Sequence, residues 1–209
     1  MPLVRQSAVN EAAGLDFANG IRSLMRQDPD IMLVGEIRDE PTASMAFRAA
    51  MTGHQVYSTL HTNSALGAVQ RLLDIGILAD VIAGNMIGIM GQRLVRRLCD
   101  ACKEPYTPQQ AERRLLALDE AGAYQLQRPV GCAACEGRGY HGRFALIEVL
   151  RLDADLDDLI ARRATQKEIT AAAHAKGFTA LAADGARHVL AGATSLEEVA
   201  RVVDLTSEV

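Results

Sequence analysis

The 209-residue sequence lacks the features by which membrane-spanning and secreted proteins are recognised. It has no run of roughly 18–20 apolar residues, the length that a membrane helix needs. The nearest candidate, residues 81–90, is short and is interrupted by two glycines and an asparagine. Charged side chains such as Arg5 and Glu11 break up the opening residues, so no signal peptide is expected. The expected location is the cytoplasm, without membrane insertion, where cysteines should not form structural disulfides.

Positive charge is also scarce. The sequence has 22 Lys and Arg residues against 26 Asp and Glu residues, which gives a formal net charge of −4. A surface that binds nucleic acid is usually basic, because it must neutralise phosphates. Nucleic acid is therefore not expected as a partner. Only three of the basic residues are lysines; arginine suits bidentate phosphate contacts, although high-GC codon usage is the simpler explanation of this bias.

The pattern of apolar residues predicts an α/β fold. Residues 31–34 form an uninterrupted apolar run, which is typical of a central strand that is buried on both faces of a parallel sheet. Asp39 can cap a helix that Gly53 terminates. Residues 55–60 then form a second strand. A strand, a helix and a strand within about 30 residues make a crossover unit, so we expect the two strands to be parallel.

Most of the other expected elements are helical. We expect a strand or a strand remnant at residues 3–10 and a helix at residues 16–27. Thr62 or Asn63 should cap a helix that ends at Gly76. The rest are an apolar, glycine-containing helix after Gly76, a polar helix at 109–121, an apolar segment at 144–150 and three short helices from Asp153 onward.

All four cysteines occur in two C-x2-C pairs, Cys99 with Cys102 and Cys132 with Cys135, separated by 29 residues. Two residues between thiolates allow a tight turn to present both sulfurs to one ion, and two such turns complete a tetrahedral zinc site. Because the protein would supply all four ligands, this zinc would be structural rather than catalytic. His141 is a possible substitute ligand. The alternatives are four inert thiols or two redox motifs, but a redox C-x2-C usually begins a helix after a strand.

The apolar run at 31–34 ends in Gly35 and Glu36. In open parallel sheets the ligand lies outside the carboxyl ends of the strands. A carboxylate at that edge can bind Mg²⁺ through water or orient an attacking water molecule in a nucleotide hydrolase. Glu36 is the candidate for this role, although many strands simply end in a solvated acid.

Three segments make this interpretation more specific: DPDIMLVGEIRDEPTA (28–43), TGHQVYSTLHTN (52–63) and QRLVRRLC (92–99). Together they resemble the type II/IV secretion ATPase family. The resemblance extends from about Gln6 to Val203 and so covers nearly the whole chain. Within the family, the four-cysteine insertion is similar to that of the secretion and pilus-extension motors, whereas the retraction motors lack it.

The resemblance implies roles for the positions that match the family's motifs. The segment at 28–43 resembles the Walker B strand, with Glu36 as the catalytic carboxylate. The segment at 52–63 resembles the family's His box, which would place His54, Thr59 and His61 near the nucleotide, with both histidines at the same sheet edge as Glu36. A neutral imidazole there can hydrogen-bond a phosphate oxygen or sense the γ-phosphate. Without the family, His54 would be interpreted as a helix-end residue and His61 as a satisfied strand-end residue.

Three arginines match basic positions of the family. Arg22, Arg26 and Arg38 are candidates for nucleotide-phosphate contacts or for pairing between subunits. Arg22 and Arg26 could instead lie on a solvated helix face, and Arg38 could pair with Asp39 or Glu40.

The resemblance also implies a fold and an assembly. Residues 1–98 would form the C-terminal half of a RecA-like P-loop NTPase parallel sheet, residues 99–142 a tetracysteine zinc module, and residues 143–209 a returning strand and an all-helical tail. Members of the family use ATP and Mg²⁺ to drive type II protein secretion or type IV pilus assembly. They act as homo-hexamers with inner-membrane platform proteins, at the cytoplasmic face of the inner membrane.

One departure from the family bears on activity. The sequence contains no Gly-Lys dipeptide, so it lacks the G-x-x-x-x-G-K-[ST] loop that cradles nucleotide phosphates. The 209 residues alone are therefore expected to be inactive, as a truncated piece or the product of a degenerate gene. The main alternative function is a non-catalytic, zinc-stabilised interaction module that docks an inner-membrane platform protein. A zinc-ribbon nucleic-acid binder is a third possibility, which the net charge disfavours.

Overall fold

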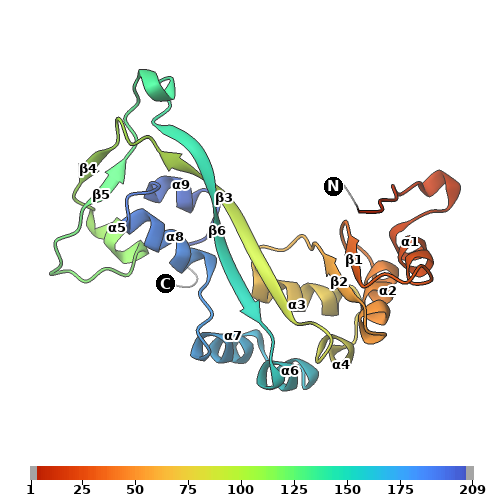
Figure 1. The fold of residues 1–209 in the computed structure, drawn as a ribbon. Helices are drawn as coiled ribbons and strands as arrows, with labels where there is room; N and C mark the ends of the chain where they lie inside the picture. Colours follow the sequence, from red (N-terminus) through yellow and green to blue (C-terminus); the bar gives the residue numbers. More distant parts are fainter. Residues whose placement is uncertain (1–3, 206–209) are drawn as a thin grey trace. The chain divides into compact units, whose positions relative to one another are not determined.

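A computed structural model describes residues 4–205 of the chain, which form an α/β structure (Figure 1). The chain divides into two compact units. The first contains the residues up to Ile89 together with Arg151–Lys176, and the second contains Met90–Leu150 together with the residues from Gly177 onward. These boundaries differ from the three segments that composition and family resemblance suggest.

A parallel crossover lies at the centre of the first unit. Strands β1 (Ile31–Val34) and β2 (Gln55–Ser58) pair in parallel, and helix α2 (Glu40–Met51) connects them. Both the crossover and its parallel pairing are thus confirmed. The helix begins where the sequence predicts, because the carboxylate of Asp39 accepts a hydrogen bond of 2.9 Å from the backbone N–H of Thr42. That N–H is one of the groups that a helix cannot satisfy by itself.

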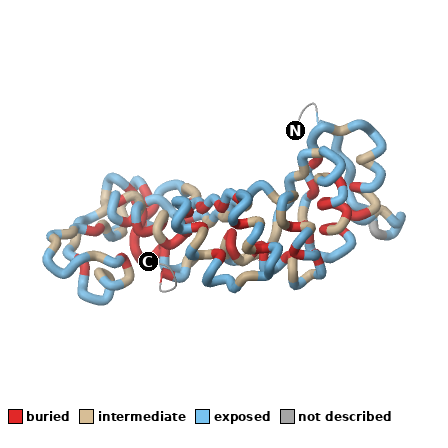
Figure 2. Tube along the Cα trace, turned by 90° about the horizontal axis from the view of Figure 1, so that it is seen from below, coloured by how far each residue is buried: buried red, intermediate tan, exposed pale blue. Residues whose placement is uncertain are grey.

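Within residues 4–205, the β1–β2 sheet is covered on one face only. Met32 and Val34 are 3% and 4% exposed, whereas Ile31 and Leu33 are 62% and 67% exposed. Tyr57 of β2, which pairs with Leu33, is 49% exposed. The expectation that β1 is buried on both faces is therefore wrong for the described residues. Buried and exposed positions alternate along β1. Figure 2 colours the chain by how far each residue is buried.

The segment before β1 contains the short 3-10 helix η1 (Glu11–Ala13) and helix α1 (Phe17–Leu24). Asp16 caps α1, which confirms the helix expected there. Of the strand expected at 3–10, residue 3 lies outside the described residues and residues 4–9 have no regular structure. Asn10 forms only an isolated bridge. This strand prediction is wrong for the residues that the structure describes.

Four more helices complete the first unit: α3 (Ala65–Asp74), α4 (Ala79–Ile82), α6 (Ala154–Ala161) and α7 (Gln166–Ala175). α6 packs against α4 and α7. The cap of α3 is Ser64, whose hydroxyl accepts a hydrogen bond of 3.1 Å from the N–H of Gly67. Thr62 and Asn63 precede the cap, so their predicted role is wrong by one or two positions.

Of the apolar, glycine-containing helix expected after Gly76, only the short α4 is formed. α4 ends at Ile82, and Gly84 adopts φ +74°, a left-handed conformation that ends the helical path. The chain is extended again from Gly88, where β3 begins. The segment contains three residues that favour turns, and their conformational preference outweighs its apolar character.

The second unit is built on a long two-stranded ribbon, β3 (Gly88–Leu98) paired with β6 (Tyr140–Arg151). Helices α8 (Leu181–Leu190) and α9 (Leu196–Ala200) pack with it around a shared core. The core includes Val95, Leu126, Leu146, Val189 and Val199, all 0% exposed. The buried carboxylate of Glu148 on β6 accepts a hydrogen bond from the N–H of Leu181 and so caps α8.

Between β3 and β6 the chain forms a small antiparallel pair, β4 (Glu104–Tyr106) with β5 (Leu126–Arg128). Helix α5 (Gln110–Leu115) lies between these strands in sequence, and the 3-10 helix η2 (Ala133–Cys135) follows them. The polar helix expected at 109–121 therefore exists but is shorter. After β6, the described regular structure is entirely helical, with α6 to α9 in place of three helices. No helix in the described part of the chain is long and apolar enough to cross a bilayer.

Candidate functional site

The ends of β1 and β2 lie side by side because the two strands are paired in register, Val34 opposite Ser58. Two hydrogen bonds continue this pairing past the strand ends. The N–H of Ile37 donates to the carbonyl oxygen of Thr59 at 2.9 Å, and the hydroxyl of Thr59 donates to the carbonyl oxygen of Gly35 at 2.8 Å. These bonds fix the backbone on both sides of Glu36 against the segment that leads to His61.

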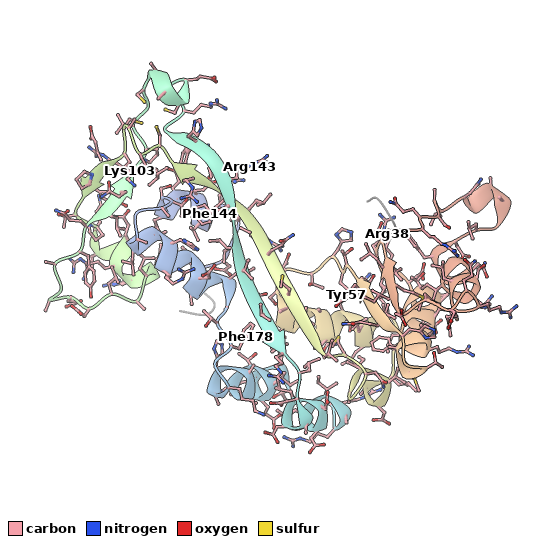
Figure 3. All side chains as sticks on the ribbon, in the orientation of Figure 1. Arg38, Tyr57, Lys103, Arg143, Phe144 and Phe178 are labelled. Atoms are coloured by element: carbon pink, nitrogen blue, oxygen red, sulfur yellow. The ribbon has the colours of Figure 1, made fainter. Side chains whose placement is uncertain are left out.

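Arg38 and His61 both bond one carboxylate oxygen of Glu36. Nε of Arg38 donates to Oε2 of Glu36 at 2.6 Å, and Nε2 of His61 donates to the same oxygen at 3.0 Å. The side chains of Arg38 and His61 are 70% and 79% exposed, whereas that of Glu36 is 20% exposed. Arg38 is labelled in Figure 3, where it extends from the segment that follows β1. The pairing of Arg38 is thus with Glu36, and not with Asp39 or Glu40.

The electrostatics of this edge favour an ionised carboxylate. Hydrogen bonds from Arg38 and then from His61 lower the pKa of Glu36 below its usual value, and they outweigh the opposing effect of burial. Glu36 therefore carries a negative charge at neutral pH. An ionised carboxylate with an exposed imidazole beside it can accept a hydrogen bond from a water molecule and orient it.

His54 does not share this edge. It immediately precedes β2, whereas Glu36 and His61 follow the C-terminal ends of the paired strands. Its Nδ1 lies 3.0 Å from the carbonyl oxygen of Ala49, to which it donates, and 3.1 Å from the hydroxyl of Thr52. The expectation that both histidines lie at the edge of Glu36 is wrong for His54. The physical reason is that His54 lies at the N-terminal end of β2, whereas His61 follows its C-terminal end. The two residues therefore lie at opposite ends of the paired strands.

The arginines before β1 are not part of the Glu36 cluster either. Arg22 lies in the last turn of α1, and its Nη1 donates to Oδ1 of Asn19 at 2.8 Å. Arg26 follows the same helix and is exposed. Arg22 is thus on an exposed helical turn and Arg26 in the exposed turn that follows the helix.

The four cysteines form a single cluster in the second unit. Their sulfurs all lie within 4.8 Å of one another. Three of the separations are Cys99–Cys132 at 3.9 Å, Cys102–Cys135 at 3.8 Å and Cys132–Cys135 at 3.8 Å. A tetrahedron with Zn–S bonds of about 2.3 Å has sulfur–sulfur edges of about 3.8 Å. The sulfurs therefore already lie at the corners of a site of the size that Zn²⁺ needs.

Backbone N–H groups surround the sulfurs as they would a thiolate. Sγ of Cys135 accepts from the N–H of Cys132 at 3.2 Å and from that of Gly139 at 3.1 Å. Sγ of Cys102 accepts from Gly131 at 3.3 Å. Gly131 has φ +112°, and a Cβ there would come within 2.5 Å of a backbone oxygen, so only glycine fits this turn.

These contacts act unequally on the thiols. The N–H donor of Cys132, with that of Gly139, lowers the pKa of Cys135 to about 6. Burial raises the pKa of Cys102 to about 11. One sulfur of the cluster is thus prepared as a thiolate, and a bound metal would deprotonate the others. Among the described residues, the group of possible metal ligands consists of the four cysteines and does not include His141.

A buried ion pair that sequence patterns do not single out lies near the first cysteine pair in sequence. Arg96 precedes the first cysteine pair, and its backbone and guanidinium bond the buried carboxylate of Glu198. The two residues are separated by 102 positions. The only local signal is Ser195, a helix cap that the sequence S-L-E-E allows.

Known protein families and sequences match nearly the whole chain. A family model described as "Type II/IV secretion system protein" matches residues 1–201. The type II secretion system protein E of Pseudomonas aeruginosa is 46% identical over 199 residues, which cover 95% of this chain and 39% of that protein. The type IV pilus assembly ATPase TfpB of Acinetobacter baylyi is 46% identical over 203 residues, which cover 96% of this chain and 35% of that protein. The chain thus spans less than half the length of these relatives.

Solved structures resemble the chain in fold. The pilus retraction motor PilT with bound ADP matches with a TM-score of 0.62 at 24% identity, over 90% of this chain and 44% of that one. The DotB ATPase of Legionella pneumophila matches with a TM-score of 0.59 at 23% identity, over 90% of this chain and 42% of that one. At these identities the likeness shows a shared α/β fold.

Proposed function

The chain belongs to the type II/IV secretion system protein family, and we propose that it is the C-terminal part of a cytoplasmic traffic ATPase. The longer protein would couple ATP hydrolysis to type II protein secretion or to type IV pilus assembly. The observation that carries this proposal is the convergence of Arg38 and His61 on Glu36, at the C-terminal ends of two parallel strands. That is the edge at which open α/β sheets bind their ligands.

Glu36 is the proposed catalytic carboxylate. In the longer protein it would accept a proton or a hydrogen bond from the attacking water, or hold Mg²⁺ through a water molecule. ATP with Mg²⁺ supplies the phosphoryl group for this chemistry. Arg38 and His61 keep Glu36 ionised, which the role requires.

We propose that Thr59 and His61 connect Glu36 to the nucleotide, which would lie at the C-terminal ends of β1 and β2. Thr59 holds the two strand ends together through Gly35 and Ile37. The exposed His61 donates a hydrogen bond to the oxygen of Glu36 that Arg38 also bonds. It is therefore placed to exchange this hydrogen bond for one to a phosphate oxygen. Its loss should uncouple hydrolysis from movement while leaving nucleotide affinity within a few-fold. For His54, Arg22 and Arg26, a nucleotide role stays a prediction, because their described contacts do not involve Glu36.

The second half of the proposal concerns the 209 residues alone. They lack the lysine and the glycine-rich backbone that hold nucleotide phosphates, so we expect them to be inactive by themselves. The RecA-like P-loop sheet would be complete only in the longer protein. The exposed apolar face of β1, with Ile31 and Leu33, supports this, because parallel sheets are normally covered on both faces.

The four-cysteine cluster is the proposed site of one structural Zn²⁺. Sulfur spacing and N–H···S hydrogen bonds support it. Four protein ligands leave no position for water or substrate. The assembly of the longer protein as a homo-hexamer, its location at the inner face of the inner membrane and its contact with a platform protein are further parts of the proposal that rest on family membership. A non-catalytic docking module remains the second candidate for the isolated chain.

The proposal is tested in the longer protein with a matched pair of variants. Glu36→Gln should retain nucleotide binding and slow ATP hydrolysis by several orders of magnitude, because it removes the charge that positions water and metal. Glu40→Gln is the control: Glu40 lies four residues further on and bonds Ser44 instead. Normal turnover by Glu36→Gln would overturn the catalytic assignment. Turnover by the isolated 209 residues well above background would overturn their proposed inactivity.

A further inference from the structure

Helix α9 carries a buried negative charge. The side chain of Glu198 is 0% exposed, although carboxylates are rarely buried without partners. The backbone N–H of Glu198 bonds the hydroxyl of Ser195, which caps the helix. A buried carboxylate on a five-residue helix can be stable only if other elements supply its hydrogen bonds.

Two arginines supply them. From β3, Arg96 donates its backbone N–H to Oε1 of Glu198 at 3.0 Å and its Nη2 to Oε2 at 2.6 Å. From beyond the helix, Arg201 donates Nη2 to Oε1 at 2.8 Å and Nε to Oε2 at 3.2 Å. Each oxygen therefore accepts two hydrogen bonds, and one of the four comes from a backbone group whose position is set by β3.

The same helix is bonded to β6 at its N-terminus. The hydroxyls of Tyr140 and Ser195 lie 2.7 Å apart, and the guanidinium of Arg96 stacks 4.0 Å from the centre of the Tyr140 ring. The segment before the helix pairs with the end of β3, because the N–H of Leu98 donates to the carbonyl oxygen of Ala193 at 2.9 Å. The α9 segment is thus held by two residue pairs on β3, Arg96 with Glu198 and Leu98 with Ala193, and by one on β6, Tyr140 with Ser195.

These anchor residues adjoin the cysteines. Leu98 is followed directly by Cys99, whose N–H donates to the carbonyl oxygen of Gly139 at 3.0 Å. Gly139 precedes Tyr140 and donates to Sγ of Cys135. Lys103, labelled in Figure 3, directly follows Cys102. It donates a hydrogen bond to the carbonyl oxygen of Gly192, in the turn before α9. The first cysteine pair is therefore flanked in sequence by two residues that hold the α9 segment, and the second pair accepts a hydrogen bond from Gly139, the residue before Tyr140.

We propose that metal binding at the four cysteines and docking of α9 are thermodynamically linked, with Glu198 as the positioning residue that acts through Arg96. The inference rests on the zinc site proposed above. A metal that fixes Cys99 and Cys135 also fixes the backbone of Leu98, Gly139 and Tyr140, which α9 needs as partners. Conversely, α9 holds the ends of β3 and β6 in the positions that bring the two cysteine pairs together. Linkage of this kind is reciprocal.

The first measurement is Zn²⁺ affinity, by competition with a chromophoric chelator, in the full 209-residue chain. Glu198→Gln should weaken Zn²⁺ binding by about tenfold, which is within the usual range of coupling between two sites. Glu104→Gln is the matched control. It removes the same charge from an exposed ion pair with Arg128, and Glu104 lies only two residues from Cys102. An effect of charge alone would therefore appear at Glu104 first, whereas linkage predicts an unchanged affinity there.

The second measurement is backbone amide exchange with and without a chelator. Removal of Zn²⁺ should speed exchange at Leu196–Ala200 and at Leu98 by the coupling factor, which is also the largest loss of Zn²⁺ affinity that undocking of α9 can cause. Exchange in α2, in the other unit, serves as the internal reference and should not change. Equal Zn²⁺ affinity for Glu198→Gln and the wild type, or unchanged exchange in α9 after chelation, would overturn the linkage.

Two further arms keep the outcomes separable. If Glu198→Gln does not fold, Tyr140→Phe decides: it keeps the ring beneath Arg96 and removes only the hydroxyl bonded to Ser195. A few-fold loss of Zn²⁺ affinity supports the linkage, and wild-type affinity overturns it. Failure of the wild-type chain to bind Zn²⁺ would instead remove the zinc proposal itself. Four-sulfur binding in the wild type, with no response in the variants, would remove the linkage alone.

Discussion

Nε2 of His61 lies 3.0 Å from Oε2 of Glu36, although 25 positions separate the two residues. The distance is set by the parallel register of β1 and β2 and by the two hydrogen bonds of Thr59, which extend the pairing beyond the strand ends. The contact joins the acidic end of one strand to the histidine that follows the next. His61 is one of two hydrogen-bond donors to this carboxylate. The other is Arg38, at 2.6 Å.

Removal of either donor should raise the pKa of Glu36. Arg38→Gln should raise it more than His61→Ala, because the Arg38 bond is the larger cause of the lowered pKa and is shorter. A folded-state pKa below the usual value stabilises the fold above the unfolded pKa, and this contribution is lost as pH falls through the folded value. Carboxyl ¹³C NMR titration measures the pKa directly. His54→Ala is the control and should leave it unchanged. An unaltered midpoint in Arg38→Gln would contradict the described pairing.

Adjacent residues of β1 should respond differently to truncation. Met32→Ala removes a side chain that is 3% exposed and should lower the free energy of unfolding by about 2–4 kcal/mol. Leu33→Ala removes one that is 67% exposed and should cost less than about 1 kcal/mol in the 209-residue chain. Urea denaturation of both variants compares them. Similar losses at the two positions would mean that both faces of the strand are covered.

The chain should contain about one Zn²⁺ with four sulfur ligands at about 2.3 Å. Elemental analysis and X-ray absorption check the stoichiometry and the ligand set. Cys132→Ser should lose the metal and expose residues 99–142 to protease, while the β1–β2 sheet stays folded. His141→Ala, which changes the other candidate ligand, should retain the metal. A metal-free chain that keeps this segment protected under chelation would rule out a structural zinc.

Glu198 should make stability depend on pH. Burial opposes its ionisation, but hydrogen bonds from Arg201 and Arg96 outweigh burial and lower its pKa to about 2. Relative to a usual value of 4.5, this corresponds to at most about 3 kcal/mol, present above about pH 5 and lost as pH falls toward 2. Glu198→Gln should therefore be less stable than wild type at pH 7, and the difference should shrink at pH 3.

Urea denaturation at the two pH values measures this difference. Glu104→Gln, in an exposed pair with Arg128, should change stability by less than about 1 kcal/mol at either pH. The comparison is made on the chelated chain at both pH values, because Glu198→Gln is also expected to change Zn²⁺ affinity and bound metal would add to the difference at pH 7. A difference between Glu198→Gln and wild type that is the same at pH 7 and pH 3 would mean that the carboxylate is not held ionised.

The sequence by itself determined the features that depend on neighbouring residues. The cap at Asp39, the parallel crossover from β1 to β2 and the pairing of cysteines by C-x2-C turns all follow from spacing within a few residues or one supersecondary unit. Family membership was also contained in local motifs, because those motifs hold the groups that the chemistry needs. Local hydrogen-bonding and backbone preferences are the same wherever the segment lies in the fold.

Only the tertiary structure decided which faces and partners these elements have. An apolar run predicts a strand but not how many faces of that strand are covered. Ile31 and Leu33 of β1 are exposed within the described residues. Two histidines in one motif reach opposite edges of a sheet, because edge assignment depends on strand direction. The bond between Arg96 and Glu198 joins residues 102 positions apart. Burial and long-range hydrogen bonds depend on which surfaces meet, and that information resides in the packing of the whole chain rather than in any window of its sequence.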